Sequence, residues 1–196
     1  NEPRVEHWQA EHFPYHGAYC GDVDLTGWRK PISHYRDMLW NVEEGAADVY
    51  LAVREPDYYV NGHVTETLWS VWPTWESWNW RGWEGKDIEA EIYTKAPKVN
   101  FYFNYKLISE RDVNIDPQYK AVIKLPYQPG TLKAVSVDAN GKEMAESTLR
   151  TSSEPAAIRL TPDRKHIDAD GQDLAFIMVD VVDNDGNIPS RNCAAC

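Results

Sequence analysis

The sequence predicts a mainly β protein centred on an immunoglobulin-like β-sandwich. From about residue 49 to residue 150, apolar and polar residues alternate with a period of two, as in strands that bury one face. The turn signals Gln128-Pro129-Gly130 and Asn140-Gly141 separate these segments. About seven short strands at this spacing are typical of an antiparallel sandwich. The length of 196 residues and an apolar fraction of 42% suffice for a sizeable core.

A single helix is predicted ahead of the sandwich, over residues 31–41. Pro31 suits a first helical turn. Five residues then share one face at the i, i+3, i+4, i+7 spacing. They are Ile32, Tyr35, Arg36, Leu39 and Trp40. The residues before Pro31 read as a long structured loop.

The strands expected in the sandwich are 49–54, 88–92, 99–103, 119–125 and 132–137. A second β region follows the polar linker 151–155, with strands at 157–160 and 174–182 and a turn at Asp185-Gly186. Only about forty residues remain for it, too few for a complete sandwich. We therefore expect 151–196 to be an incomplete second sandwich.

Six of the nine tryptophans fall within fifteen residues: Trp69, Trp72, Trp75, Trp78, Trp80 and Trp83. Such a density indicates either a packed core or a surface on which sugar rings stack. Pro73 argues against a helix, so the run predicts strand, turn and strand. Most of the indoles should lie in the core, because six exposed ones would form a large apolar patch on the surface. We expect Trp78, Trp80 and Trp83 to be the exposed ones, as candidates for contact with sugar or with another domain, because Asn79, Arg81 and Gly82 are typical of loops.

The formal net charge of −11 argues against nucleic acid or an anionic membrane as partner. No apolar run approaches the roughly 20 residues of a membrane span. Neither the histidines near the N-terminus nor the terminal pair Cys193 and Cys196 has the surroundings of a metal site, so we expect no metal and no cofactor. The chain begins with Asn1 instead of Met, which indicates a processed product or a piece of a longer protein.

Asp22 and Asp24 are two carboxylates on a glycine-flanked loop. Glycosidic hydrolysis uses two carboxyl groups on either side of the scissile bond, at least about 5 Å apart. Residues separated by one position usually point apart, so we expect these two to shape the loop or to bind a ligand, and not to form a catalytic pair.

Several blocks in order resemble glycoside hydrolase family 2. They are GAYCGDVDLTGWRKPISHYRDMLW (17–40), VYLAVREP (49–56), the tryptophan run, PYQPGTLKAV (126–135) and SEPAAIRLTPDRKHIDADGQDLAF (153–176). The resemblance is to the bacterial β-galactosidase-like branch with extra C-terminal sandwich domains, and it fails from about Ile188 on. It implies that 1–45 is the last loop and helix of a (β/α)8 barrel, that 46–150 is an accessory sandwich, and that 151–196 is the incomplete second one.

The resemblance also implies a function. Family members hydrolyse β-galactosides or related β-glycosides with retention, using two glutamates on earlier barrel strands. This chain should then hold no catalytic residue and be inactive alone. Tyr19 and Asp22 match positions beside the bound sugar, at the rim of the substrate pocket. The implied partners are a carbohydrate and the barrel of the parent chain, and the family is often periplasmic or extracellular. The alternative is a stand-alone carbohydrate-binding or structural β-sandwich module.

Without a barrel, the apolar face of the 31–41 helix would lack its cover. We therefore expect 1–45 to be less ordered than 47–150, or to dock this face on a neighbour.

Overall fold

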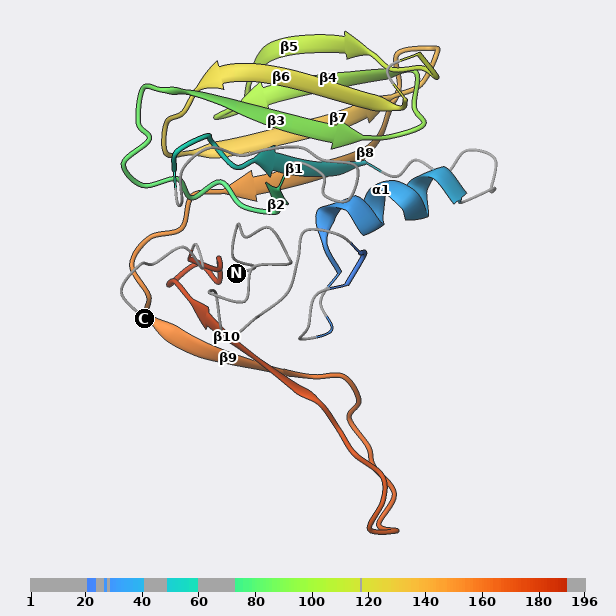
Figure 1. Cartoon of the computed structure of the whole chain (residues 1–196), viewed down its shortest axis with the longest axis vertical. Coiled ribbons are helices and arrows are strands. Elements are labelled where there is room, and N and C mark those ends of the chain that lie inside the picture. Colours follow the sequence, from blue (N-terminus) through green and yellow to red (C-terminus); the bar gives the residue numbers. More distant parts are fainter. Residues whose placement is uncertain are drawn as a thin grey trace, which may run out of the picture. The chain divides into compact units, whose positions relative to one another are not determined.

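A computed structural model describes residues 21–23, 27, 29–40, 49–59, 73–116 and 118–189 (Figure 1). The chain divides into two compact units, Asn1–Arg150 and Thr151–Cys196. Each is described by itself.

The first unit contains two four-stranded antiparallel sheets, stacked as two layers (Figure 1). One sheet has the order β2-β1-β3-β6 and consists of β1 (Tyr50–Arg54), β2 (Thr74–Trp75), β3 (Asp87–Tyr93) and β6 (Lys120–Pro126). The other has the order β5-β4-β7-β8 and consists of β4 (Lys98–Phe103), β5 (Lys106–Asp112), β7 (Thr131–Val137) and β8 (Glu143–Arg150). The predicted β-sandwich is therefore confirmed.

Alternation along the strands builds the core. In β3, Ile88, Ala90 and Ile92 are fully buried between the sheets, while Glu89 lies on the outer face and is partly exposed. The same period places apolar side chains of β1, β4, β6 and β7 in one contiguous cluster. Its strand residues are Leu51, Val53, Ile88, Ala90, Ile92, Val99, Phe101, Ala121, Ile123, Leu132, Ala134 and Leu149.

Both turns predicted inside the sandwich are present. Between β7 and β8, Gly141 takes φ 86°, and the Asp138 carboxylate accepts the backbone N–H groups of Asn140 and Lys142, each at 2.8 Å. Between β6 and β7, Gly130 passes so close to the β4–β5 turn that a Cβ there would lie 2.5 Å from Oδ1 of Asn104. These glycines therefore have steric reasons to be glycine.

The helix α1 (Pro31–Trp40) confirms the predicted helix, and its two buried residues lie outside the face that the sequence spacing singled out. Trp40 is 73% exposed, whereas Ser33 and Met38 are the buried residues. His34 and Tyr35 make ring contacts with the sandwich, and Tyr35 belongs to the face expected from the sequence. Residues 1–20 and 41–48 lie outside the described ranges, so the expected contrast in order between 1–45 and 47–150 stays a prediction.

Within the described part of the tryptophan run, a short strand and turns are present as predicted, but the second predicted strand is wrong. Only Thr74 and Trp75 are in a strand, and 76–86 form an irregular loop with turns at 81–82 and 84–85. Trp69 and Trp72 lie outside the described residues.

The second unit contains a two-stranded antiparallel hairpin of β9 (Ala157–Pro162) and β10 (Ile177–Val182). Both predicted strands are present, although β10 begins three residues later than expected. The register places five apolar residues on one face, each between 49% and 68% exposed. These residues, the hairpin ladder, are Ile158, Leu160, Ile177, Val179 and Val181.

Candidate functional site

The loop between β2 and β3 carries two tryptophans into the core. Trp78 is 0% exposed and Trp80 is 1% exposed. The Trp78 indole N–H donates to the backbone carbonyl of Gln128 at 3.0 Å, and that of Trp80 to the carbonyl of Ser77 at 3.2 Å. Both indoles therefore have their polar atom satisfied inside the protein.

Tyr127, which follows β6, holds this loop in place. Its ring packs edge-on against Trp78, with centroids 5.2 Å apart, and Phe103 packs on the same indole at 6.2 Å. The Tyr127 hydroxyl accepts the backbone N–H of Trp80 at 3.1 Å and lies 3.4 Å from the carbonyl oxygen of Trp78. The expectation that Trp78 and Trp80 are exposed is wrong, because a residue distant in sequence supplies partners that draw the loop inward.

Trp83 differs from these two because its ring is only partly buried. Its N–H donates to the carbonyl of Asp87 at 2.9 Å, and Tyr59 meets the ring edge-on at 5.9 Å. The Lys86 ammonium lies 4.4 Å from the ring centroid, a cation–π distance. Of the three tryptophans singled out from the sequence, Trp83 is the one with a ring partly open to a ligand.

Asp22 lies on the short loop before α1. Its carboxylate pairs with Arg36 of α1, and its backbone carbonyl accepts the N–H of Lys30 at 2.9 Å. These contacts attach the loop to the helix and fix where Asp22 lies. Tyr19 and Asp24 lie outside the described residues, so the expectation that Tyr19 and Asp22 share a pocket rim stays a prediction.

The outer face of the β2-β1-β3-β6 sheet carries a polar cluster that the sequence analysis missed. Glu91 of β3 is only 3% exposed, yet it accepts hydrogen bonds from Arg54 of β1 and, at 2.9 Å, from the Tyr93 hydroxyl. Tyr50 lies opposite Tyr93, and its hydroxyl donates to Glu76 at 3.3 Å. The sequence signal that could have found this cluster is the set of residues that alternate with the core positions of β1 and β3. These residues include Tyr50, Arg54, Glu91 and Tyr93, which share the outer face of the sheet.

Burial dominates the acid–base behaviour of this cluster. It raises the pKa of the Tyr50 and Tyr93 hydroxyls far above the ordinary 10, and the nearby carboxylates add to that shift. Burial also raises the pKa of Glu76, against the opposing effect of its hydrogen bond from Tyr50. Both tyrosines are therefore neutral hydrogen-bond donors near pH 7, and the arrangement is suited to holding elements together.

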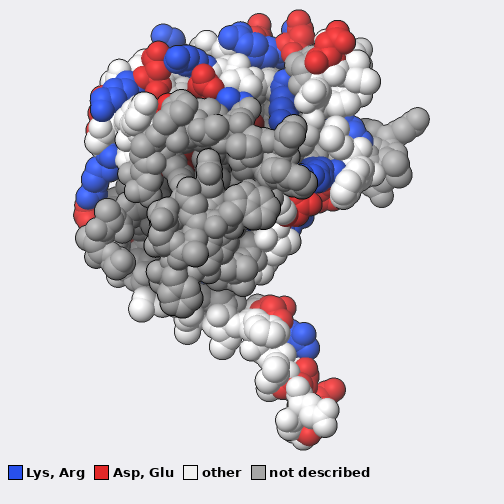
Figure 2. Space-filling view, viewed as in Figure 1, with Lys and Arg blue, Asp and Glu red and all other residues white. Residues whose placement is uncertain are grey.

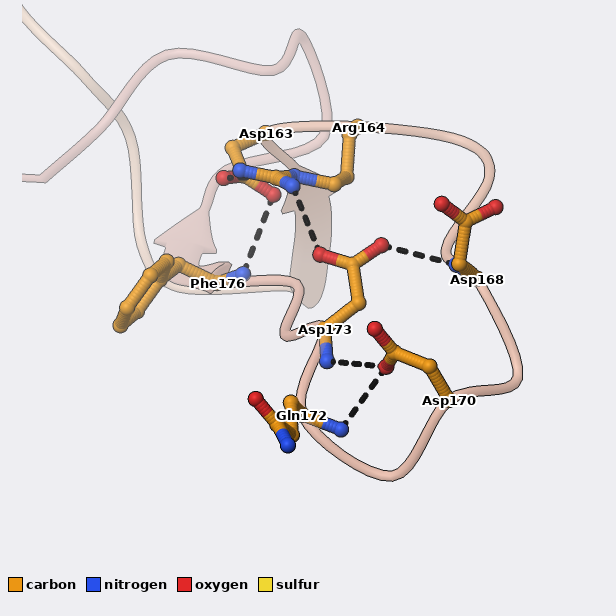
Figure 3. Close-up of polar contacts among 7 residues, drawn as sticks. All are labelled: Asp163, Arg164, Asp168, Asp170, Gln172, Asp173 and Phe176. Atoms are coloured by element: carbon orange, nitrogen blue, oxygen red, sulfur yellow. Dashed lines mark hydrogen bonds and ion pairs between the residues drawn. The ribbon is translucent and has the colours of Figure 1, made fainter.

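The loop that joins β9 to β10 is rich in aspartate, and its carboxylates bind the loop itself (Figure 3). Asp173 accepts the Arg164 guanidinium at 3.0 Å and the backbone N–H of Asp168 at 2.8 Å. Asp170 accepts the N–H groups of Gln172 and Asp173, and these bonds lower its pKa. Asp163 accepts the N–H of Phe176 at 3.0 Å. These contacts shape a loop and do not form a ligand site.

The described ranges contain no group of three or more His, Cys, Asp or Glu residues placed to hold a metal ion. They also contain no helix long and apolar enough to span a membrane. On the face shown in Figure 2, acidic and basic side chains lie interspersed over the sandwich. Within the described sandwich, Lys133 of β7 and Glu146 of β8 form an ion pair at 2.8 Å. Cys193 and Cys196 lie outside the described residues.

Two family models match the chain. Residues 85–145 match a domain of unknown function, DUF4982, and residues 158–192 match the glycoside hydrolase family 2 C-terminal domain 5. Among curated proteins, β-galactosidase BoGH2A of Bacteroides ovatus is 29% identical over 177 residues, which are 90% of this chain and 17% of that protein.

Solved structures agree with these matches. A glycosyl hydrolase family 2 member from Bacteroides cellulosilyticus superposes with a TM-score of 0.75 at 33% identity, over 86% of this chain and 22% of that one. A β-glycosidase from Bacteroides vulgatus, at 22% identity, shares the fold with a TM-score of 0.64 over 86% of this chain and 18% of that one. The chain thus spans about a fifth of the length of these relatives. Sequence and structure together show that it corresponds to the C-terminal portion of a glycoside hydrolase family 2 protein.

Proposed function

We propose that this chain is a non-catalytic part of a retaining glycoside hydrolase that acts on β-galactosides or related β-glycosides, with its catalytic glutamates outside the chain. The match over 90% of the chain to a protein named as a β-galactosidase carries this proposal. The geometry is consistent with it, because the described carboxylates of the candidate sites bind arginines, tyrosine hydroxyls and backbone N–H groups of the fold.

In this proposal residues 1–45 belong to the end of the catalytic barrel, 46–150 are an accessory sandwich, and 151–196 are part of a second sandwich. The hairpin ladder supports the last assignment, because an aliphatic row on one face of a hairpin is what a sandwich buries against its second sheet. An isolated two-stranded hairpin is marginal in water, so this one needs a further layer. The partners proposed for the chain are the barrel and a carbohydrate.

Tyr19 and Asp22 are proposed at the rim of the substrate pocket. The pairing of Asp22 with Arg36 supports this, since it would give the carboxylate a fixed position relative to α1. A carboxylate held in this way is suited to accept hydrogen bonds from sugar hydroxyls.

The first test is turnover of nitrophenyl β-galactoside by the isolated chain, with its folding checked by circular dichroism. We expect no turnover from the chain and robust turnover from the full-length parent protein. In the parent, Asp22→Asn should raise KM more than it lowers kcat, because the proposed contact is with bound sugar. Glutamate-dependent hydrolysis by the isolated chain would contradict the proposal.

The partly open ring of Trp83 favours a second candidate, a carbohydrate-binding module. Calorimetry with millimolar galactosides tests it, comparing Trp83→Ala with Trp40→Ala, which removes a mostly exposed indole from α1. Binding that Trp83→Ala abolishes and Trp40→Ala retains would establish this role. An absence of heat with the unaltered chain would leave the tryptophans with a structural role.

A further inference from the structure

The contact between α1 and the sandwich consists largely of aromatic rings. His34 lies parallel to Tyr50 of β1, with centroids 4.2 Å apart and 7° between the planes. Tyr50 in turn lies 6.0 Å from Tyr93 of β3, against which Tyr35 of α1 packs at 5.1 Å. The Tyr35 hydroxyl donates to the carbonyl of Gln118 at 2.8 Å. Two consecutive residues of α1 therefore hold the helix against one end of the sheet (Figure 1).

His34 is the ionisable member of this stack whose charge changes near neutral pH. It is half-buried, and neither ring nitrogen has a hydrogen-bond partner among the described residues. In the described part of the chain, no carboxylate is therefore bonded to the ring to favour the imidazolium. His34 also lies in the first turn of α1, where the positive end of the helix dipole disfavours a cation.

A fixed cation lies beside it. Arg29 donates to Oγ and to the carbonyl oxygen of Ser33, at 2.6 and 3.1 Å, and to Asp37 at 3.0 Å, so its guanidinium is fixed across the start of the helix. Burial lowers the pKa of His34 below the ordinary 6.5, Arg29 lowers it further, and Asp37 opposes them. Both of the larger effects favour the neutral ring in the docked state.

The charged and titratable groups on the strands do not reverse this balance. Glu76 accepts the hydrogen bond of the Tyr50 hydroxyl, and burial raises its own pKa, so its carboxylate loses negative charge more readily as the pH falls. Glu91 is already paired with Arg54 and hydrogen-bonded to Tyr93. From β6, the Lys120 ammonium lies 4.4 Å from the Tyr35 ring and 5.7 Å from the Tyr93 ring, which adds positive charge to the cluster.

We propose that the contact between α1 and the sandwich is a pH-sensitive joint with His34 as its sensor, so that the neutral ring holds α1 against β1 and protonation loosens it. When the pKa of a histidine is lower in the docked state than in the undocked state, the neutral ring favours docking. This stabilisation is complete above the pKa of the undocked histidine and is lost as the pH falls below it. Docking of α1 should therefore be strongest above pH 6.5 and weaken below it.

Hydrogen exchange of the whole chain at about pH 7.5 and about pH 5.5, corrected for intrinsic rates, tests this proposal. We expect the α1 amides to exchange several-fold faster at the lower pH, and those of β4 and β7 to stay unchanged. In His34→Phe, which keeps a stacked ring without a proton, the pH effect should vanish. The matched control is His166→Phe, at an exposed histidine between β9 and β10, which should behave like the unaltered chain.

Three results would overturn the proposal. One is α1 exchange that does not depend on pH in the unaltered chain. A second is an equal pH effect in His34→Phe, which would assign the sensor to another group, such as Glu76. The third does not need a variant: the His34 ring protons, followed by NMR, should titrate below pH 6.5, and a midpoint at or above that value would contradict a docked state that prefers the neutral ring.

Discussion

Replacing Trp78 by Ala tests whether the tryptophan run belongs to the core. A buried tryptophan removes roughly 200 Å² of surface from water, which at about 25 cal/mol per Å² gives an upper bound of about 5 kcal/mol. Large-to-small substitutions of buried aromatic residues cost about 3–5 kcal/mol. Because Trp78 is 0% exposed and packs against Tyr127 and Phe103, we expect Trp78→Ala to lower the free energy of unfolding by about 3–5 kcal/mol.

Urea denaturation of the whole chain followed by circular dichroism measures this loss. Trp40→Ala is the matched control, because Trp40 is mostly exposed and should cost no more than about 0.5 kcal/mol. Trp78→Phe keeps an aromatic ring but removes the indole N–H that donates to the Gln128 carbonyl. Gln128 is an exposed residue, so its carbonyl can bond to water instead. Trp78→Phe should cost less than Trp78→Ala, because the core keeps an aromatic ring.

Equal losses in Trp78→Ala and Trp40→Ala would refute this reasoning, because burial could then not be the source of the difference. A Trp78→Ala variant within about 0.5 kcal/mol of the unaltered chain would do so as well.

Three further substitutions test separate features. Gly130→Ala should lower the melting temperature, because its Cβ would lie 2.5 Å from the Asn104 side chain. Hydrogen bonds from Ser153 and Asn187 hold the pKa of Asp183 at about 2, below the ordinary 3.8. The stability that the ionised Asp183 contributes should therefore be lost between about pH 4 and about pH 2, as measured by acid titration with circular dichroism. Asp183→Asn should lose less stability over this range. Because the aliphatic residues of the hairpin ladder are exposed, we expect copies of the chain to associate through them in analytical ultracentrifugation. Leu160→Lys, on the ladder, should reduce this association, whereas Thr161→Lys, on the opposite face, should not.

The central strands could be predicted from sequence because each buries one face. Ile88, Ala90 and Ile92 alternate with charged residues, and β3 follows that pattern. The edge strands β5 and β8 were not among the strands named from the sequence. All residues of β5 are exposed except Ser109, which is partly buried. Neither face of the strand is therefore consistently apolar, and its sequence does not show the alternation of a strand that buries one face. An edge strand such as β5, whose alternate residues are not buried, thus has to be learned from the structure, whereas β6, an edge strand with buried Ala121 and Ile123, could be predicted.

The exposure of Trp78 and Trp80 could not be predicted because it depends on distant residues. Their neighbours Asn79, Arg81 and Gly82 correctly indicate a loop, since 76–86 are irregular. The partners that bury the two rings are Tyr127 and Gln128, almost fifty residues later in the chain. The local amino-acid composition thus predicts that a segment forms a loop, but it does not predict how far the side chains of that loop are buried.

The outer face of the β1 and β3 pair explains why α1 matters to the sandwich. In an antiparallel sheet with one wet face, outward residues are polar and exposed. Here Ala52, Glu91 and Tyr93 point outward and are nonetheless buried, so this end of the sheet is covered on both sides. A carboxylate that is shielded from water depends on its hydrogen-bond donors, because the loss of one donor leaves buried charge uncompensated. Because Tyr93 both donates to Glu91 and carries the ring on which Tyr35 packs, the contact that holds α1 also closes the space around that carboxylate. The helix that the family resemblance assigns to the barrel is therefore, in this structure, also part of the packing of the sandwich.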